Sequence, residues 1–321
     1  MSGSSQNPNL APENFMQNQA AQKLPRWTMK RKEALAFYLC ISPWIIGFIL
    51  FYLGPVIASF YFSLTNWDLL TAPKFIGLQN YVKIFTRDPL YLQSLKVTLI
   101  YTFTYVPLDL ILGLMIALLL NRPIRGIGIF RTIFYLPSVL TGVAYVVMWM
   151  WIFNPQVGLI NTLLKTIGIQ GPRWLLDPKW ALWALVLMSI FQVGRSMVIY
   201  LAGLQDVPKE LHEAASIDGA NTWSRFWKIT LPLLTPSILF NLIFGMIMTF
   251  QSFTNVYIAT NGGPLDSTLF YVLYLYQKAF SLLEMGYASA MAWILFLMVL
   301  VLTIIIFKTS GKWVFYRSET D

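Results

Sequence analysis

The sequence predicts an all-α, polytopic membrane protein with six transmembrane helices. Of its 321 residues, 57% are hydrophobic and only 12% are charged, with a mean hydropathy of +0.60. Ordinary globular chains are about half apolar and about a quarter charged. A soluble fold of this composition would lack the polar surface needed to cover its core. Six apolar segments are also long enough to cross a hydrocarbon layer of about 30 Å, which takes about 20 residues.

The chain begins with a polar stretch that is rich in Asn, Gln, Ser and Pro and has no periodicity. Such a composition cannot bury enough apolar surface to fold, so we expect a disordered cytoplasmic tail over residues 1–32. The first apolar segment, 34–64, follows a cluster of basic residues. It is too long for a signal-peptide core and has no small-residue cleavage site near its end. We therefore interpret it as an uncleaved first span.

The remaining apolar segments predict five further spans at 94–120, 130–153, 180–204, 237–260 and 286–307. Polar stretches separate them. One of these contains Asn261-Gly262-Gly263-Pro264, a strong turn signal. It also contains the semi-apolar stretch 269–280, which we expect to form an interfacial helix. Together the six spans predict a transmembrane domain over residues 33–310, followed by a second tail at 311–321.

The distribution of lysine and arginine predicts the orientation. With the N-terminus inside, 14 of the 23 basic residues fall in inside segments and eight in outside segments, and Arg195 lies within a span. An excess of basic residues marks the cytoplasmic side. We therefore expect both termini in the cytoplasm. The net charge of +9 is then explained by topology, and no nucleic-acid partner is predicted.

The most informative stretch lies between the fourth and fifth spans, at residues 205–236. It contains Glu213-Ala214-Ala215, then Gly219, and then Ile229-Thr230-Leu231-Pro232. This order predicts a helix, a break at Gly219, a second amphipathic helix and a stop before Pro232. Two small alanines permit close approach by another surface, and Glu213 offers it a carboxylate. A solvated loop with short helices is the alternative reading of the same composition.

The spacing E-A-A-x-x-x-G, nine residues, then I-x-L-P resembles the signature loop of bacterial ABC importer permeases. A longer form of the pattern is similar to the carbohydrate-uptake branch, which includes the membrane subunits of the maltose transporter. It adds Asp218, Ala220, Phe226, Leu233 and Pro236. The resemblance covers roughly residues 35–310. It implies the type I ABC importer permease fold, located in the bacterial inner membrane.

The resemblance also implies partners. In such permeases the loop forms a coupling helix that fits a cleft of a cytoplasmic ATPase subunit. If the roles known in the family are transferred to this sequence, Glu213 would pair with a basic group of the ATPase and Gly219 would make the turn between the two short helices. The ATPase-coupling residues are then Glu213, Ala214, Ala215, Asp218, Gly219 and Ala220. The family machine has a second related permease, two ATPase subunits and an extracytoplasmic solute-binding protein, which the loops at 65–93, 154–179 and 261–285 would receive.

We expect no cofactor in this chain itself. It has no G-x-x-x-x-G-K-[ST] loop, so ATP and Mg would be bound by the partner ATPase. His212 is the only histidine, so neither a catalytic nor a metal site is predicted. The chain is expected to be a transport subunit, not an enzyme.

Two charges lie at bilayer depth, where charged side chains are functional candidates by default: Asp109 in the second span and Arg195 in the fourth. Both lie about 15 residues from the outer end of their spans, so they share a depth. Three interpretations stay open. The two residues form a structural ion pair, or Arg195 faces the translocation cavity and contacts substrate, or Arg195 contacts the partner permease.

Similarity to the maltose permease subunit places sugar-lining positions in the fourth and fifth spans. These are Gln192 and Arg195, and Gly245, Met248, Thr249 and Ser252, with Gln251 and Asn255 as alternates on an adjacent strip. With Asn241 and Val256, the fifth-span set follows helical i, i+3, i+4 spacing on one face. Small and polar residues also serve helix–helix packing in membranes, which is the alternative.

The sequence therefore predicts the permease subunit of an ATP-driven importer of a sugar or oligosaccharide. Glycerol phosphates, neutral oligosaccharides and uronate oligosaccharides all suit the family, and Arg195 favours an anionic substrate because guanidinium pairs bidentately with carboxylates. A stand-alone proton-coupled transporter or channel is the alternative, since paired Asp109 and Arg195 would suit such a carrier.

Overall fold

The computed structural model describes residues 26–140 and 142–315, with side chains from residue 31 onward, and it divides into two units. The first unit, residues 1–58, contains α1 (Arg26–Phe48), the π-helical turn η2 (Ile49–Leu53) and the start of α2 (Gly54–Ser63). Residues 1–25 of the predicted N-terminal tail lie outside the described residues, as do residues 316–321 of the C-terminal one. The predicted tail boundary at residue 32 is wrong, because α1 already begins at Arg26. Lysine, arginine and methionine are good helix formers, so the helix continues through the basic cluster.

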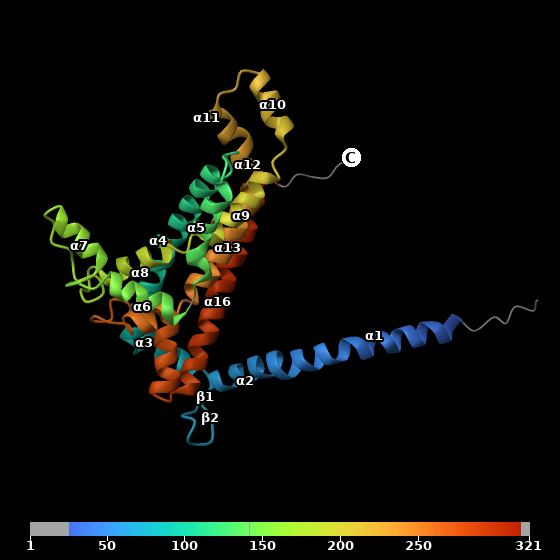
Figure 1. Ribbon diagram of the computed structural model, residues 1–321. Coiled ribbons are helices and arrows are strands. Elements are labelled where there is room, and N and C mark those ends of the chain that lie inside the picture. The colour runs from blue at the N-terminus through green and yellow to red at the C-terminus, as the bar shows by residue number, and fades with distance from the viewer. Residues whose placement is uncertain (1–25, 141, 316–321) are drawn as a thin grey trace, which may run out of the picture. The chain divides into compact units, whose positions relative to one another are not determined.

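The second unit, from Ser59 onward, contains the other described elements (Figure 1). They are β1 (Thr65–Asn66), β2 (Lys74–Phe75), α3 (Gln79–Thr86), α4 (Pro89–Leu120), α5 (Ile127–Val139), α6 (Val143–Ile152), α7 (Leu159–Thr166), α8 (Ala181–Ile190), α9 (Gly194–Gln205), α10 (Lys209–Ile217), α11 (Thr222–Arg225), η3 (Phe226–Thr230), α12 (Leu231–Leu233), α13 (Thr235–Phe250), α14 (Thr254–Ala259), α15 (Tyr271–Tyr276), η4 (Gln277–Ser281) and α16 (Met285–Ser310). The strands β1 and β2 form one short antiparallel pair. The predicted all-α class is confirmed.

Four helical stretches are long and apolar enough to cross a membrane, and two bent pairs bring the number to six if each pair is one span. The long stretches are Arg31–Ser63, Pro89–Leu120, Ala181–Gln205 and Met285–Ser310. They match the predicted first, second, fourth and sixth spans. The predicted third and fifth spans are each bent: α5 and α6 meet at 102°, and the segment Thr222–Leu233 meets α13 at 59°.

The bend between α5 and α6 has a local cause, and the bend before α13 does not lie where the sequence predicted a stop. Between α5 and α6, Gly142 adopts φ +72°, a conformation that side-chain-bearing residues avoid. The bend before α13 follows Leu233, so the predicted stop before Pro232 is wrong. The π-helical turn η3 precedes Pro232, and the Leu231 N–H bonds the carbonyl of Phe226 there. The helical segment thereby continues through the proline, because the register of the hydrogen bonds has already shifted.

The fifth span also ends earlier than its sequence predicts. α13 stops at Phe250, so Ser252 and Val256 do not continue the predicted helix face. The Thr249 hydroxyl donates to the carbonyls of Gly245 (2.9 Å) and Met246 (3.0 Å). Such bonds from threonine to the preceding turn often bend helices. The one-face prediction for residues 241–256 is therefore wrong beyond Phe250.

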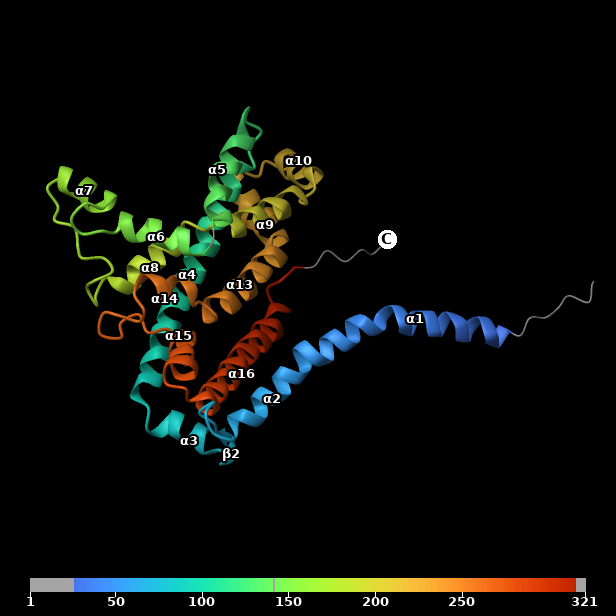
Figure 2. The same cartoon turned by 60° about the horizontal axis from the view of Figure 1, so that its bottom comes forward.

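α4 is the central helix of the second unit and packs against α8, α9 and α13 (Figure 2). Its approach to α9 is very close: a Cβ atom on Gly113 would lie 2.5 Å from Ser196 Oγ. A buried cluster of Ala117, Leu120, Met197, Tyr200 and Leu204 continues this contact. Small residues at such crossings let backbones pack by van der Waals contact, which drives helix association in lipid.

The stretch 269–280, predicted to form an interfacial helix, forms α15 and part of η4, and its first half is buried within the chain. Leu269, Phe270 and Tyr271 are almost completely buried. The Tyr271 N–H donates to Thr98 Oγ1 of α4 (2.9 Å), and its hydroxyl donates to the Met291 carbonyl of α16 (2.8 Å). Apolar composition alone does not distinguish a helix lying on lipid from one bridging two spans.

α16 connects the two ends of the second unit. Near its start, the Gly286 N–H donates to the Trp67 carbonyl in the loop between the strands (3.1 Å). Beyond its end, the Phe315 N–H donates to Thr235 Oγ1 at the start of α13 (2.8 Å). We call these the hairpin end and the coupling end. Figure 1 shows α3 and the strands at the first, and α10 to α12 at the second.

At the hairpin end, Asp88 joins three helices. It caps the N-terminus of α4 by accepting from the N–H groups of Leu90 (3.0 Å) and Tyr91 (3.2 Å). Its other oxygen accepts from the hydroxyls of Tyr274 (2.6 Å) and Tyr287. Partial burial raises the pKa of this carboxyl, but the two tyrosines, the Tyr91 N–H and Lys278 outweigh it and hold the pKa below its ordinary value.

We expect Asp88→Asn to lower the free energy of unfolding by about 1–2 kcal/mol near neutral pH, because charge-assisted hydrogen bonds are lost. A depressed folded-state pKa stabilises the fold above the unfolded pKa, about 3.9, and this contribution is lost as pH falls through the folded value. The difference in the free energy of unfolding between variant and wild type should thus be constant above about pH 5 and shrink below about pH 4. Thermal unfolding of the detergent-purified chain across pH measures it.

The control is Asp177→Asn, because that carboxylate bonds the Lys179 N–H within its own turn (2.9 Å) and bridges no helices. It should change stability by less than about 0.5 kcal/mol. Equal effects of the two substitutions at every pH would contradict the bridging role of Asp88.

Candidate functional site

The predicted coupling loop folds as two helices joined at a left-handed glycine. α10 ends at Ile217, and Gly219 has φ +77°. The Ala220 N–H bonds the Ala215 carbonyl (2.9 Å), and the Gly219 N–H bonds the Ser216 carbonyl (3.2 Å). This pair of bonds is the Schellman motif, which ends a helix where a glycine can adopt positive φ. The predicted turn at Gly219 is therefore present.

The second helix is fixed by a cap of its own. Asn221 is the N-cap of α11, and its side-chain oxygen accepts from the Ser224 N–H (2.8 Å). Two capping motifs thus lie within four residues and define the angle between α10 and α11. We call residues 209–225 the coupling segment. Its geometry is set locally by hydrogen bonds between near neighbours, so it forms a rigid projection.

The coupling segment exposes the side chains that the sequence selected. Glu213, Ala214, Asp218 and Gly219 are exposed, and Ala215 and Ala220 are half-buried. The Glu213 carboxylate makes no hydrogen bond or ion pair with any residue that the structure describes. Among the described residues, the ion pairs are Lys83–Glu284 and Lys278–Glu284, and both lie at the hairpin end. Glu213 is therefore available to a basic group of another chain.

Sequence reasoning missed two exposed apolar side chains beside these residues. Ile217 is 88% exposed and Trp223 is 70% exposed, and they flank the Gly219 turn. Single exposed apolar residues are ordinary, but a large aliphatic and an indole on a rigid aqueous projection indicate a protein contact. Ile217 lies inside the sequence motif, but only the structure shows that its side chain is almost fully exposed.

The predicted intramembrane ion pair is absent from the described residues. Asp109 accepts a hydrogen bond from the Ser196 hydroxyl (3.1 Å), whereas Arg195 donates weakly to the Ser138 carbonyl (3.5 Å). Ser196 and Arg195 are neighbours on α9, so their side chains point about 100° apart around the helix axis. Ser196 faces α4 and Arg195 faces α5. The two charges lie at a similar height, since Asp109 bonds the neighbour of Arg195 on α9, but the two side chains point to different helices.

Gln192 and Arg195 lie together at the broken third span. The Gln192 amide donates to the Leu140 carbonyl (3.4 Å), next to the Ser138 carbonyl that Arg195 approaches. Gly194 permits this closeness, since a Cβ atom there would lie 2.6 Å from the Phe134 carbonyl oxygen. Arg195 is exposed and Gln192 is half-buried. Both donors thus lie on an accessible surface of the spans.

The fifth-span candidates divide into two groups. Thr249 is buried with its hydroxyl bonded to its own helix, and a Cβ atom on Gly245 would meet Val106 of α4 at 3.6 Å. Gly245 therefore faces α4, and Thr249 lies one turn further along α13. Met248 and Gln251 are exposed, whereas Ser252 and Asn255, beyond the end of α13, are half-buried. The packing interpretation therefore fits Gly245 and Thr249.

A family model described as binding-protein-dependent transport system inner membrane component matches residues 109–309. The chain belongs to this family. The match includes the coupling segment, Asp109 and Arg195. It confirms the predicted ABC importer permease, a membrane transport subunit and not an enzyme, and it rejects a stand-alone carrier or channel.

Individual relatives agree with this assignment. The chain is 52% identical to the probable ABC transporter permease protein YesP of Bacillus subtilis over 295 residues, which cover 91% of this chain and 95% of the relative. It is 36% identical to the sulfoquinovosyl glycerol transport system permease protein SmoG of Agrobacterium fabrum, covering 89% and 94%. It is also 36% identical to the lactose transport system permease protein LacF of Rhizobium radiobacter, covering 89% and 98%.

A solved structure confirms the type I permease fold. A chain of a bacterial ABC transporter involved in the import of the acidic polysaccharide alginate superposes with a TM-score of 0.77 at 22% identity. The match covers 89% of this chain and 99% of that one.

We expect Gly219→Val to abolish coupled transport while the protein still inserts in the membrane. Holding a β-branched residue at φ +77° costs at least about 1–2 kcal/mol, which offsets the gain of about 0.5–1.5 kcal/mol from each of the two capping bonds. The Schellman motif should open, and the angle between α10 and α11 should no longer be fixed. Uptake and transport-dependent ATP hydrolysis in proteoliposomes measure the effect.

Gly219→Asn is the matched control, because asparagine tolerates the left-handed conformation and no other atom lies within 4 Å of the added Cβ. It should retain most of the activity. If both variants transport equally well, the conformation at Gly219 does not matter for coupling.

Proposed function

We propose that this chain is the permease subunit of an importer for a sugar or oligosaccharide, and that the coupling segment docks on a separate cytoplasmic ATPase. The observation that supports this most directly is the rigid projection with exposed Ile217, Trp223 and Glu213. In this proposal Ile217 and Trp223 fill an apolar cleft of the ATPase, and Glu213 pairs with a basic group there.

The complete transporter contains a second related permease, two ATPase subunits that bind ATP and Mg, and an extracytoplasmic solute-binding protein. Relatives named for lactose and for sulfoquinovosyl glycerol support a saccharide substrate. The lysine and arginine distribution supports cytoplasmic termini and a cytoplasmic coupling end. Closure of the ATPase dimer on ATP would move α10, and because α9 leads directly into α10, the motion would reach the contact between α9 and α4.

We expect Ile217→Ser to weaken assembly with the ATPase by about 10- to 100-fold, because burial of an isoleucine contributes about 1.5–3 kcal/mol. ATP-dependent uptake should fall with it. The measurement is co-purification of the ATPase subunit with the permease pair, followed by uptake in proteoliposomes with ATP inside. Leu265→Ser is the matched control for co-purification of the ATPase, since Leu265 is also 88% exposed but lies between α14 and α15, outside the coupling segment. Uptake that followed a proton gradient instead of ATP would overturn the importer proposal.

We further propose that Arg195 and Gln192 face the translocation path. Non-helical backbone at membrane depth is tolerated only where it is buried in protein or lines a water-filled cavity. The break after Leu140 is such backbone, and the two side chains that bond its carbonyls are accessible. An exposed guanidinium at this depth suits a substrate with an acidic group.

We expect Arg195→Gln to reduce uptake at least tenfold per assembled transporter, with Arg195→Lys intermediate because it keeps the charge but loses the planar fork. Uptake of labelled saccharide, normalised to the amount of assembled complex, measures it. Asp109→Asn serves as comparison and should leave the Arg195 effect unchanged, since the two residues do not touch. Loss of assembly with normal uptake per complex would favour contact with the partner permease instead.

A further inference from the structure

The loop between α6 and α8, residues 153–180, contains the short helix α7 and lies across the membrane from the coupling segment. The loop and the coupling segment flank the single span Ala181–Gln205, so they are on opposite sides of the bilayer. Figure 1 shows α7 beyond the ends of α6 and α8. We call residues 153–180 the α7 loop.

Tryptophan side chains define the depth of the α7 loop. Trp151 lies in the last turn of α6 and Trp180 is the N-cap of α8, and both are exposed. Inside the loop, the ring centroid of Trp174 lies 5.4 Å from that of Phe153 and 5.6 Å from that of Trp180. Tryptophan is enriched where a span enters the headgroup region. The α7 loop therefore begins and ends at that level.

Asn161 connects α7 to these tryptophans. Its buried side-chain oxygen accepts a hydrogen bond from Trp174 Nε1 (2.7 Å), and its amide donates to the carbonyls of Pro155 and Pro172 (3.1 Å each). The neighbouring Ile160 packs against the main core cluster of the chain. α7 is thereby bonded to both ends of its loop and to the tryptophan cluster, at the level of the headgroups.

The side chains of α7 form three edges about a third of a turn apart, since each residue rotates the helix by about 100°. The packed edge faces the protein and consists of Ile160 and Asn161. The apolar edge is exposed, and its members lie four residues apart: Leu159, Leu163 and Ile167. The polar edge is exposed as well and consists of Thr162, Lys165 and Thr166. The apolar and polar edges thus lie on either side of the protein contact.

This arrangement suits a helix that lies where protein, lipid and water meet. The three side chains of the apolar edge are between 50% and 68% exposed. A single exposed leucine is ordinary, but a stripe of three leaves a contiguous apolar surface in water unless something covers it. Acyl chains cover such a stripe when the helix lies flat in the interface, and the polar edge then faces water.

The charges of the α7 loop favour an anionic lipid. The loop contains three cations, Lys165, Arg173 and Lys179, and one carboxylate, Asp177. Asp177 accepts from the Lys179 N–H (2.9 Å), and the three cationic side chains make no hydrogen bond or ion pair with the described residues. All three cations are exposed. Basic groups beside an inserted apolar stripe strengthen binding to anionic headgroups.

We propose that α7 is an interfacial helix that binds anionic phospholipid in the leaflet opposite to the coupling segment. Leu159, Leu163 and Ile167 lie among the acyl chains, while Lys165 and Lys179 pair with headgroup phosphates. Because α7 is bonded within the loop that joins α6 to α8, the lipid surface stabilises the adjoining ends of both spans. The inference requires a chain that spans the membrane, but neither a particular substrate nor the ATPase.

The first test measures the surroundings of α7 in the assembled transporter, reconstituted in nanodiscs of phosphatidylglycerol and phosphatidylcholine. Cys40 is the only cysteine, so a nitroxide label can be attached through Leu163→Cys or Lys165→Cys in a chain with Cys40→Ser. The ratio of collisions with oxygen to collisions with a water-soluble nickel chelate should be at least about threefold higher at position 163 than at position 165, because oxygen concentrates in hydrocarbon.

Two results of this test would overturn the proposal. Equal ratios at the two positions would mean that the apolar edge lies in water. A label at position 163 that is shielded from both reagents would mean that a protein surface, and not lipid, covers the edge.

The second test measures the lipid preference at α7 with a fluorophore on the same Leu163→Cys chain. Brominated phosphatidylglycerol should quench it at least about twofold more strongly than brominated phosphatidylcholine at equal mole fraction, because the cations attract the anionic headgroup. Lys165→Gln combined with Lys179→Gln should abolish this difference. Equal quenching by the two lipids in the chain that keeps both lysines would overturn the anionic site.

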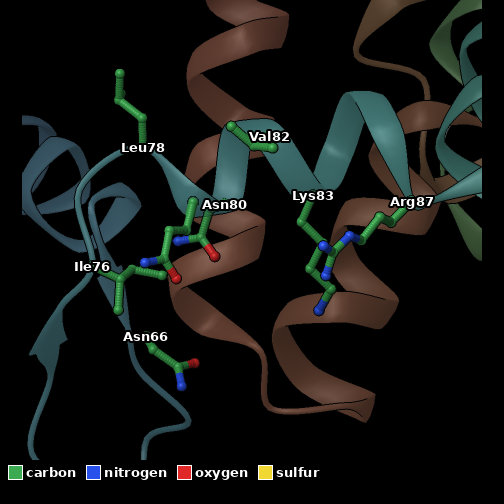
Figure 3. Close-up of a pocket in the computed structure, with 8 residues that line it drawn as sticks. Asn66, Ile76, Leu78, Asn80, Val82, Lys83 and Arg87 are labelled. Carbon is green, nitrogen blue, oxygen red and sulfur yellow. The ribbon is translucent and has the colours of Figure 1, made fainter.

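Lys74→Gln combined with Arg87→Gln is the matched control. It removes the same charge from exposed residues on the same side of the membrane. Arg87 lines a pocket of about 590 Å³ together with Asn66 and Asn80 (Figure 3). Both views show α3 and β2 apart from α7 (Figures 1 and 2). The control should keep the difference in quenching, and an equal loss in the two double variants would overturn α7 as the lipid site.

Discussion

The close approach of α4 and α9 at Gly113 and Ser196 is the contact on which the second unit depends. A side chain at Gly113 would collide with Ser196 Oγ at 2.5 Å, so the two backbones pack with nothing between them. α4 begins at Asp88, at the hairpin end, and α9 continues into the coupling segment. In the proposed mechanism, a displacement of α10 would reach α9 through the three-residue link 206–208 and then α4 through this packed crossing.

The carboxylates at the two ends of this unit differ in how they are bonded. At the hairpin end, Asp68, Asp88 and Glu284 all accept hydrogen bonds within the chain. At the coupling end, Glu213 makes no hydrogen bond or ion pair with the described residues, and Ile217 and Trp223 are exposed beside it. A carboxylate without a partner beside exposed apolar side chains can be matched by a complementary protein surface.

The sequence was sufficient for features that depend on local chemistry. Hydrophobic length located four spans within a few residues, apart from the earlier start of α4, and the E-A-A-x-x-x-G spacing located a turn that needs glycine because φ is positive. Features that depend on the third dimension were missed. No glycine or proline marks the end of α13 at Phe250, and composition does not show that α15 bridges α4 and α16. Asp109 and Arg195 do not meet because Arg195 points away from α4 around the axis of α9. Counting residues along a helix gives the height of a side chain but not this direction.

The irregular backbone in the spans explains why Arg195 does not need Asp109. The Ser138 carbonyl lies in the last turn of α5 and the Leu140 carbonyl at its C-cap, and an unbonded carbonyl in hydrocarbon costs several kcal/mol. Gln192 and Arg195 approach these oxygens at 3.4 and 3.5 Å, at the outer limit of hydrogen bonding. Bonds this long are weak, and in the proposed translocation path water can replace the donors at these carbonyls, so the donors would turn to a substrate oxygen at little cost. Asp109 is meanwhile bonded to Ser196 at the α4–α9 crossing, so it contributes to the packing of these two helices. Because the two rare charges lie on different sides of α9, Arg195 would exchange partners in the proposed mechanism without loosening this crossing.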